Sequence, residues 1–222
     1  MHMFPSWAKN ILFLLVVMIS GLTLVIVIEG LISGTELLPF NTAIESFMIQ
    51  LRTPFLTDFF VVITKLGSPF LFTFTAILIA ILLFVRKNIY EAILLVLATG
   101  VSLVAVTILK DTLQVARPAY DLITTNGWSF PSGHATMATT FFFIVSYIFF
   151  GKMKTIAGKI YLILGSILGV ILVCLSRLYL GAHWALDVLG GIALGLLSVS
   201  LTVIAFNLIF EHWRPERKKL GL

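Results

Sequence analysis

Three short clusters of polar residues interrupt a very apolar chain. They run from Lys110 to Pro118 (K-x6-R-P), from Pro131 to His134 (P-S-G-H), and from Ser176 to Asp187 (S-R-x5-H-x3-D). Together the clusters supply three cations, a Ser-Gly turn that opens onto a helix, two histidines and an aspartate. Cations and uncovered backbone N–H groups bind phosphate, and a histidine can act as a nucleophile or as an acid. The clusters therefore contain the groups that phosphoryl transfer needs.

The cations of the first cluster are common features when each is taken alone. Lys110 closes an apolar run, and a lysine in that position often only reaches toward the membrane surface. Arg117 precedes Pro118, which restricts the backbone, and a guanidinium can bind two phosphate oxygens at once. In company with Arg177 of the third cluster, we expect both to bind phosphate.

The second cluster precedes a long apolar run with helical character. Ser132 is a natural N-cap, and Gly133 leaves backbone N–H groups uncovered. Helix capping alone explains Ser132, but it does not explain His134 in the first turn, where the helix dipole disfavours a cationic imidazole. A bound phosphate would reverse that penalty. His134 is therefore a candidate general acid.

The third cluster contains a second histidine and a carboxylate four residues later. If a helix begins near His183, then His183 and Asp187 are neighbours on one helix face, and the carboxylate can hold the imidazole tautomer. The other ring nitrogen would be free to attack phosphorus. Burying an unpaired carboxylate in a membrane protein costs roughly several kcal/mol, so Asp187 should have His183 as its partner.

A metal site is the main chemical alternative, because two histidines and one carboxylate can form a facial triad. Three cations around the same point favour an anion over a divalent metal. The sequence also lacks the acidic cluster that two-metal phosphatases use. We therefore predict chemistry without a metal and without any other cofactor.

The composition excludes an ordinary soluble domain, because 59% of the residues are hydrophobic and only 11% are charged. A helical span needs about 20 apolar residues, and six runs approach this length: Ile11–Ile32, Phe70–Val85, Ala92–Leu109, Ala135–Phe150, Ile160–Leu175 and Val188–Ile209. Gly165-x3-Gly169 and Gly191-x3-Gly195 permit close helix packing in the last two runs. The single cysteine, Cys174, excludes an internal disulfide. We expect residues 1–222 to form one membrane-embedded domain.

An amphipathic helix is predicted between the first two spans. Its apolar residues recur at helical spacing: Ile44, Phe47, Met48 and Leu51. We expect it to lie in the outer membrane interface, where it could pack on the bundle or guide substrate. Pro54 ends it, and the stretch from Phe55 to Leu66 could belong to the second span. The predicted fold is an all-α bundle of six transmembrane helices with this interfacial helix between helices 1 and 2.

The positive charges predict the orientation in the membrane. If the spans alternate, ten basic residues share one side: Lys9, Arg86, Lys87, Lys152, Lys154, Lys159, Arg214, Arg217, Lys218 and Lys219. The other side carries five: Arg52, Lys65, Lys110, Arg117 and Arg177. The positive-inside rule then predicts a multi-pass cell-membrane protein with cytoplasmic termini and extracytoplasmic clusters. The basic residues after Trp213 favour a topology signal or contact with anionic lipids over nucleic-acid binding.

The three clusters together resemble the signature of the type 2 phosphatidic acid phosphatase superfamily, which also includes vanadium-dependent haloperoxidases and glucose-6-phosphatase. All eleven fixed positions of that signature are present in order, and a composite motif of this kind is highly specific. In size and in its compact loops the chain is similar to bacterial lipid phosphatases of the phosphatidylglycerophosphatase B type, some of which also hydrolyse undecaprenyl pyrophosphate.

The resemblance implies a role for each site residue. His183 would form a phosphohistidine, Asp187 would orient it, and His134 would protonate the leaving group. Five other signature residues would hold the phosphate: Lys110, Arg117, Ser132, Gly133 and Arg177.

We therefore expect a metal-independent membrane phosphatase acting on phosphatidylglycerophosphate, phosphatidate or undecaprenyl pyrophosphate. A lipid phosphotransferase with the same site remains an alternative, as does an anion or lipid transporter. Transport would leave the pair of His183 and Asp187 without a role. The sequence does not fix the preferred lipid or the oligomeric state.

Overall fold

The computed structural model describes residues 6–33 and 38–210, and this part of the chain is entirely helical apart from turns and loops. Its helices are α1 (Ser6–Ser33), α2 (Leu38–Gln50), α3 (Pro54–Leu66), α4 (Pro69–Val85), α5 (Ile89–Leu113), α6 (Gly133–Phe150), α7 (Ile156–Tyr179) and α8 (Ala185–Phe210). The prediction of an all-α membrane bundle is confirmed.

Five of these helices are each long and apolar enough to cross a membrane: α1, α5, α6, α7 and α8. The pair of α3 and α4 passes the same test together, although the two helices are bent by 43° at their junction. The described residues thus contain five candidate spans, or six if the bent pair counts as one.

The bend between α3 and α4 has a local cause. Gly67 is the C-cap of α3, and the side chain of Ser68 caps α4 by accepting a hydrogen bond from the Leu71 N–H at 3.2 Å. Pro69 occupies the first turn of α4, where its missing N–H costs nothing. The sequence left it open whether residues 55–66 belong to the second span. They form a separate helix, α3, that is bent sharply away from α4.

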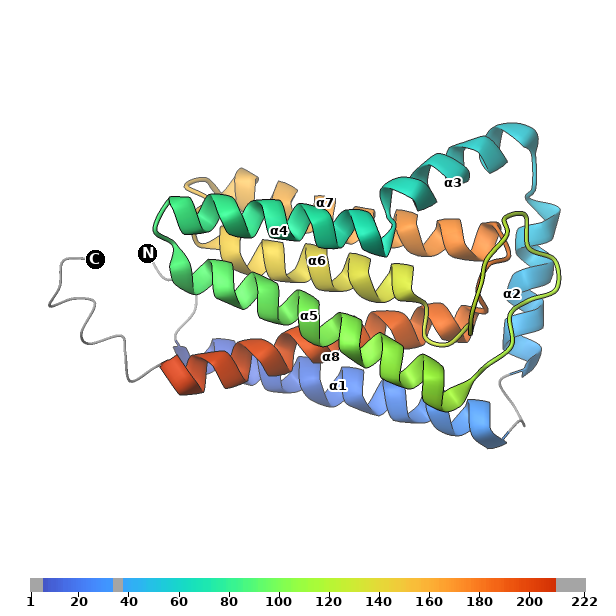
Figure 1. The fold of residues 1–222 in the computed structure, drawn as a ribbon, viewed down its shortest axis with the longest axis horizontal. Coiled ribbons are helices and arrows are strands. Elements are labelled where there is room, and N and C mark those ends of the chain that lie inside the picture. The colour runs from blue at the N-terminus through green and yellow to red at the C-terminus, as the bar shows by residue number, and fades with distance from the viewer. Residues whose placement is uncertain (1–5, 34–37, 211–222) are drawn as a thin grey trace, which may run out of the picture.

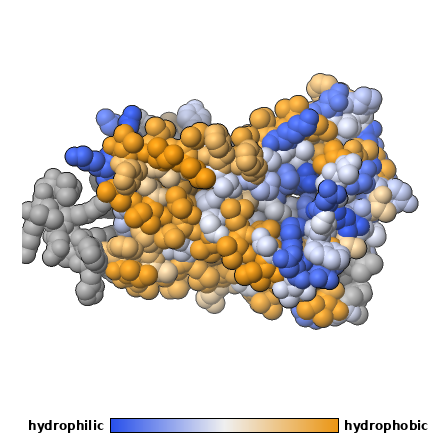
Figure 2. Space-filling model, in the orientation of Figure 1, coloured by the Kyte–Doolittle hydropathy of each residue, from blue (hydrophilic) through white to orange (hydrophobic). Residues whose placement is uncertain are grey.

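The long helices lie side by side, and α2 crosses one end of the bundle (Figure 1). The α4–α5 and α6–α7 turns lie at the opposite end. Hydrophobic side chains cover the body of the molecule, whereas hydrophilic side chains gather around the α2 end (Figure 2). An apolar band with one polar end is the surface expected of a helical bundle that sits in a bilayer.

Glycines allow α8 to approach α6 closely. A Cβ atom on Gly195 would lie 2.8 Å from the carbonyl oxygen of Thr136, nearer than real Cβ contacts allow. The predicted packing role is also correct for Gly169, where a Cβ would collide with the ring of Phe142. It is wrong for Gly165, which has no atom within 4 Å of that position and therefore packs against nothing in the described bundle.

Helix α2 packs on the bundle through its polar side. The Asn41 side-chain oxygen accepts a hydrogen bond from the Leu186 N–H at 3.0 Å, and Asn41 is buried. Phe47 and Leu51 of the predicted apolar stripe are exposed on the outer face, where a membrane interface would cover them. The helix predicted between the first two spans is present. Asn41 and Glu45 of its polar face are turned into the protein, whereas Ser46 and Gln50 are exposed.

Candidate active site

The three polar clusters meet at the α2 end of the bundle. The eight predicted site residues come from five places: Lys110 in the last turn of α5, Arg117 in the α5–α6 loop, Ser132, Gly133 and His134 at the start of α6, Arg177 in the last turn of α7, and His183 and Asp187 around the start of α8. Hydrogen bonds join four of the eight directly: Arg117, Ser132, His183 and Asp187.

His183 and Asp187 form the predicted pair. The His183 Nδ1 atom lies 3.3 Å from Asp187 Oδ2, and both side chains are buried. Helix α8 begins at Ala185, so the expectation that it begins near His183 was two residues early. The pair forms nonetheless because Asp187 Oδ2 also accepts a hydrogen bond from the Trp184 N–H at 2.8 Å. A carboxylate in the first turn that reaches back to the capping residue in this way fixes the turn before the helix.

The surroundings of His183 favour a neutral imidazole. Burial, together with the positive charges of Arg177, Arg117 and Lys110, lowers the pKa of His183 well below its usual value. Its Nε2 atom lies 3.4 Å from Arg117 Nη1, on the ring edge away from Asp187. A neutral ring whose Nδ1 faces a carboxylate leaves a lone pair on Nε2.

Arg117 ties the α5–α6 loop to the turn before α8. Its Nε atom donates to the Gly127 carbonyl at 2.9 Å, and Nη2 donates to the carbonyls of Asn126 and Trp128 at 3.1 Å and 3.3 Å. Nη1 donates to the Ala182 carbonyl at 2.7 Å. The guanidinium is thereby held next to His183, as a phosphate-binding arginine would need to be.

Lys110 reaches the same loop from α5. Its Nζ atom donates to the carbonyl oxygens of Trp128 and Ser129, the second at 3.2 Å. The side chain of Lys110 therefore does not simply extend toward the membrane surface. Lys110 points into the site.

Arg177 is almost completely buried, with 3% of its surface exposed. Nη1 donates to the hydroxyl of Thr64 on α3 at 2.5 Å, whereas Nε is buried and has no hydrogen-bond partner among the described residues. A buried donor without a partner is costly, and a guanidinium more so, unless a ligand satisfies it.

The start of α6 has the predicted cap. The Ser132 side chain accepts from the Ala135 N–H at 3.4 Å, and the Ser132 N–H donates to the Asp187 carbonyl at 3.0 Å. These contacts bring Gly133 and His134 beside α8. His134 is half-buried and lies close enough to His183 and Arg177 to interact with them electrostatically.

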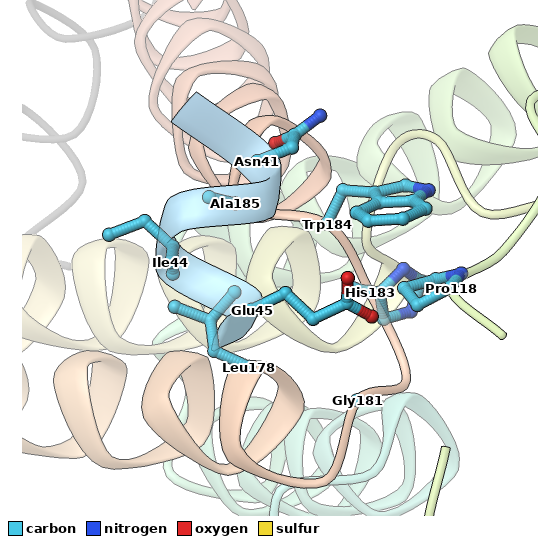
Figure 3. Close-up of a pocket in the computed structure, with 9 residues that line it drawn as sticks. All are labelled: Asn41, Ile44, Glu45, Pro118, Leu178, Gly181, His183, Trp184 and Ala185. Carbon is cyan, nitrogen blue, oxygen red and sulfur yellow. The ribbon is translucent and has the colours of Figure 1, made fainter. Parts of the chain in front are cut away.

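A small pocket reaches His183 from the α2 side (Figure 3). Its lining residues are Asn41, Ile44, Glu45, Pro118, Leu178, Gly181, His183, Trp184 and Ala185. The Glu45 side chain extends from α2 toward His183, and its Oε1 atom is buried with no hydrogen-bond partner in the part of the chain that the structure describes. The sequence assigned Glu45 no role.

Three further residues make contacts around the site that were not predicted. Ser129 contacts both Asp187 and His183, and Thr64 contacts Arg177. Arg52, considered only as a charge, donates to the carbonyls of Tyr179 and Tyr120 at 3.3 Å and 2.9 Å. Only the position of Ser129, two residues before Pro131, offered a signal, because it lies beside a cluster already under consideration.

Comparisons with known proteins agree with this arrangement. Residues 91–211 match the family model of the PAP2 superfamily. Phosphatidylglycerophosphatase B of Bacillus subtilis (strain 168) is 34% identical over 165 residues, which cover 71% of this chain and 78% of that protein. Sphingosine-1-phosphate phosphatase 2 of Mus musculus is 34% identical over 110 residues, 45% of this chain but only 29% of that protein.

Two solved structures share the fold. A crystal structure of a transmembrane PAP2-type phosphatidylglycerolphosphate phosphatase from Bacillus subtilis matches with a TM-score of 0.78 at 26% identity, over 84% of this chain and 94% of that one. The structure of LpxE from Aquifex aeolicus matches with a TM-score of 0.60 at 27% identity, over 74% and 94% respectively. The clustered site, the helical membrane bundle and these matches together show that the chain belongs to the PAP2 superfamily and is a membrane phosphatase of that family.

Proposed function

We propose that the protein hydrolyses a lipid phosphate at the membrane surface through a phosphohistidine on His183. The observation that carries this proposal is the buried imidazole of His183, which contacts Asp187 through Nδ1 and faces Arg117 with Nε2. A nucleophile needs a free lone pair and a partner that stabilises the charge it acquires, and this pair provides both.

In the first step, Nε2 of His183 attacks phosphorus while the bond between phosphorus and the lipid oxygen breaks. The departing oxygen takes a proton from His134, which must therefore enter the reaction protonated. The negative charge of the substrate phosphate favours that protonated state, because it offsets the positive charges of Lys110, Arg117 and Arg177, which oppose protonation of His134. In the second step, water gives a proton to the now neutral His134 and attacks the phosphohistidine, the nitrogen–phosphorus bond breaks, and inorganic phosphate leaves.

The phosphate would be held by cations and by backbone donors at the start of α6. The unpartnered Nε of Arg177 is a direct indication of an anionic ligand. Lys110 and Arg117 donate to loop carbonyls between Asn126 and Ser129. A phosphate oxygen is a stronger, charged acceptor than a carbonyl, so substrate would compete for these donors.

We propose phosphatidylglycerophosphate as the preferred substrate, because the relative that covers most of this chain is named for that activity. The position of the site supports a lipid: the site residues lie at helix ends beside the apolar band, so a headgroup could meet them while acyl chains stay in the bilayer.

We also propose that the site faces the extracytoplasmic side and that both termini are cytoplasmic. Five basic residues of the described helices and turns support this, because they lie at the end opposite the site: Arg86, Lys87, Lys152, Lys154 and Lys159. The basic C-terminal residues, with their predicted contact to anionic lipids, lie outside the described residues, as does the side chain of Lys9.

The test is phosphate release from purified protein presented with phosphatidylglycerophosphate, phosphatidate and undecaprenyl pyrophosphate side by side. We expect release from all three or from a subset, fastest with the first. A phosphotransferase would release little inorganic phosphate and would instead form a phosphate ester with an added alcohol acceptor. Absence of both release and transfer, with lipid movement across vesicles, would instead support a transporter.

A further inference from the structure

Ser129 is a buried residue of the α5–α6 loop whose hydroxyl and carbonyl both contact site residues. Its hydroxyl donates to Asp187 Oδ2 and lies 3.3 Å from His183 Nδ1. We propose that Ser129 is a positioning residue that fixes the tautomer and orientation of the His183 nucleophile. This inference rests on the proposed phosphohistidine mechanism.

The direction of the hydrogen bonds follows from the single proton of the hydroxyl. Because Ser129 donates to Asp187, it can only accept from His183, so the His183 proton must be on Nδ1. If Ser129 instead donated to His183 Nδ1, the ring proton would have to be on Nε2. That proton would then face the Arg117 Nη1 donor at 3.4 Å. Two donors cannot satisfy each other, and a protonated Nε2 could not attack phosphorus. The surroundings therefore favour the reactive tautomer.

The backbone of Ser129 is fixed at both ends of the residue. Its N–H donates to the Val115 carbonyl at 2.8 Å, and its own carbonyl accepts from Lys110 Nζ at 3.2 Å. Ser129 is fully buried, so water does not compete for its hydroxyl. A hydroxyl held this way is preorganised: the entropy of orienting it is lost when the protein folds, and no further entropy is lost during the reaction.

The hydroxyl becomes more important as the reaction proceeds. When the Nε2–phosphorus bond forms, the imidazole acquires positive charge, and its Nδ1–H is a stronger donor. Ser129 Oγ and Asp187 Oδ2 both lie 3.3 Å from that nitrogen and can share this proton. Without the serine, Asp187 loses a donor and the imidazolium loses an acceptor. The effect should therefore fall on the chemical step and not on lipid binding.

The test compares Ser129→Ala, Ser129→Thr and a matched control in purified full-length protein, with phosphatidylglycerophosphate in detergent as substrate. Ser200→Ala is the control, because it removes a hydroxyl from a fully buried serine of α8 that lies 13 residues, or about 20 Å of helix, from Asp187. We expect Ser129→Ala to lower kcat roughly 10- to 100-fold, the usual loss for a partner that orients a reactive group, with KM changed less than about twofold. Ser129→Thr should recover most of kcat, and Ser200→Ala should match the unaltered protein.

A single-turnover measurement of phosphoenzyme formation keeps the inference testable if threonine does not fit the buried site. Slower formation in Ser129→Ala at an unchanged melting temperature supports the positioning role. Unaltered kcat, or a loss confined to KM, overturns it, as does a threonine variant of unaltered melting temperature that stays as slow as the alanine variant. The wider mechanism fails separately: it fails if His183→Ala still releases phosphate, whatever Ser129 does.

Discussion

Gly191 of α8 lies directly against Ser132 at the start of α6. A Cβ atom on Gly191 would be 2.7 Å from the Ser132 carbonyl oxygen and 3.0 Å from the Ala135 Cβ. The Ser132 N–H also donates to the Asp187 carbonyl at 3.0 Å. Helix α8 therefore carries Asp187 and sets the position of the turn that would bind phosphate.

Substituting Gly191 should disturb catalysis without touching a reactive group. Gly191→Ala places a methyl group where backbone already lies, so the start of α6 must shift by several tenths of an ångström. We expect kcat/KM to fall about 10- to 100-fold, because small misplacements of positioning groups are costly. Gly165→Ala is the matched control, since no atom lies within 4 Å of its new methyl group. Equal activity in the two variants would contradict the role of this close approach.

Much of the arrangement could be predicted from the sequence because its signals were local or compositional. The apolar runs predicted the spans, and the Ser132 cap of α6 formed as expected. His183 and Asp187 lie together as expected, although α8 begins two residues later than predicted. The hydrogen bond from the Trp184 N–H to Asp187 holds the same geometry.

The missed features depend on which distant segments meet. Ser129 and Thr64 are ordinary residues until the loop folds over His183 and α3 approaches Arg177. The helix α2 was expected in the membrane interface, but the sequence did not indicate that Asn41 would accept a hydrogen bond from the backbone of Leu186 at the start of α8. No sequence pattern records these partners, since each contact joins segments far apart in the chain.

The proposed orientation predicts the accessibility of single cysteines. In a Cys174→Ser background, a cysteine at Asn126 should react with an impermeant thiol reagent added to intact cells. A cysteine at Lys154, exposed at the opposite end of the bundle, should react only after the membrane is permeabilised. The reverse pattern would invert the topology and place the site in the cytoplasm.

Activity should survive exhaustive chelation and should be inhibited by vanadate. Lys110, Arg117 and Arg177 surround His183 closely enough to act on it electrostatically, and they supply the positive potential that metal ions provide in other phosphatases. Vanadate can adopt the trigonal-bipyramidal geometry of phosphorus during in-line attack. Hydrolysis of a short-chain phosphatidate in detergent, with and without added magnesium or zinc, is the assay. If chelation abolishes turnover and one metal restores it, His134, His183 and Asp187 must be reconsidered as ligands.

His183 should remain neutral in mildly acidic solution. Its pKa is lowered by burial and by neighbouring cations, so it should not gain a proton as pH falls through about 6.5, the value of an ordinary histidine. The unfolded chain would gain that proton, so this residue should make the protein less stable as pH falls below about 6.5. The measurement is nitrogen NMR of labelled histidines, with the His183 signal identified by its loss in His183→Ala. A midpoint at or above 6.5 would disprove the neutral-nucleophile assignment.

The most direct test of the mechanism is to trap the phosphorylated enzyme. Protein mixed with substrate labelled in its phosphate should be denatured in alkali within one turnover, because phosphohistidine resists alkali and is lost in acid. We predict label on His183, no label and no turnover in His183→Ala, severe impairment in Asp187→Asn, and only partial loss in Ser132→Ala, which removes one of several phosphate-binding groups. Label on another residue, or near-normal hydrolysis by His183→Ala, would contradict the account.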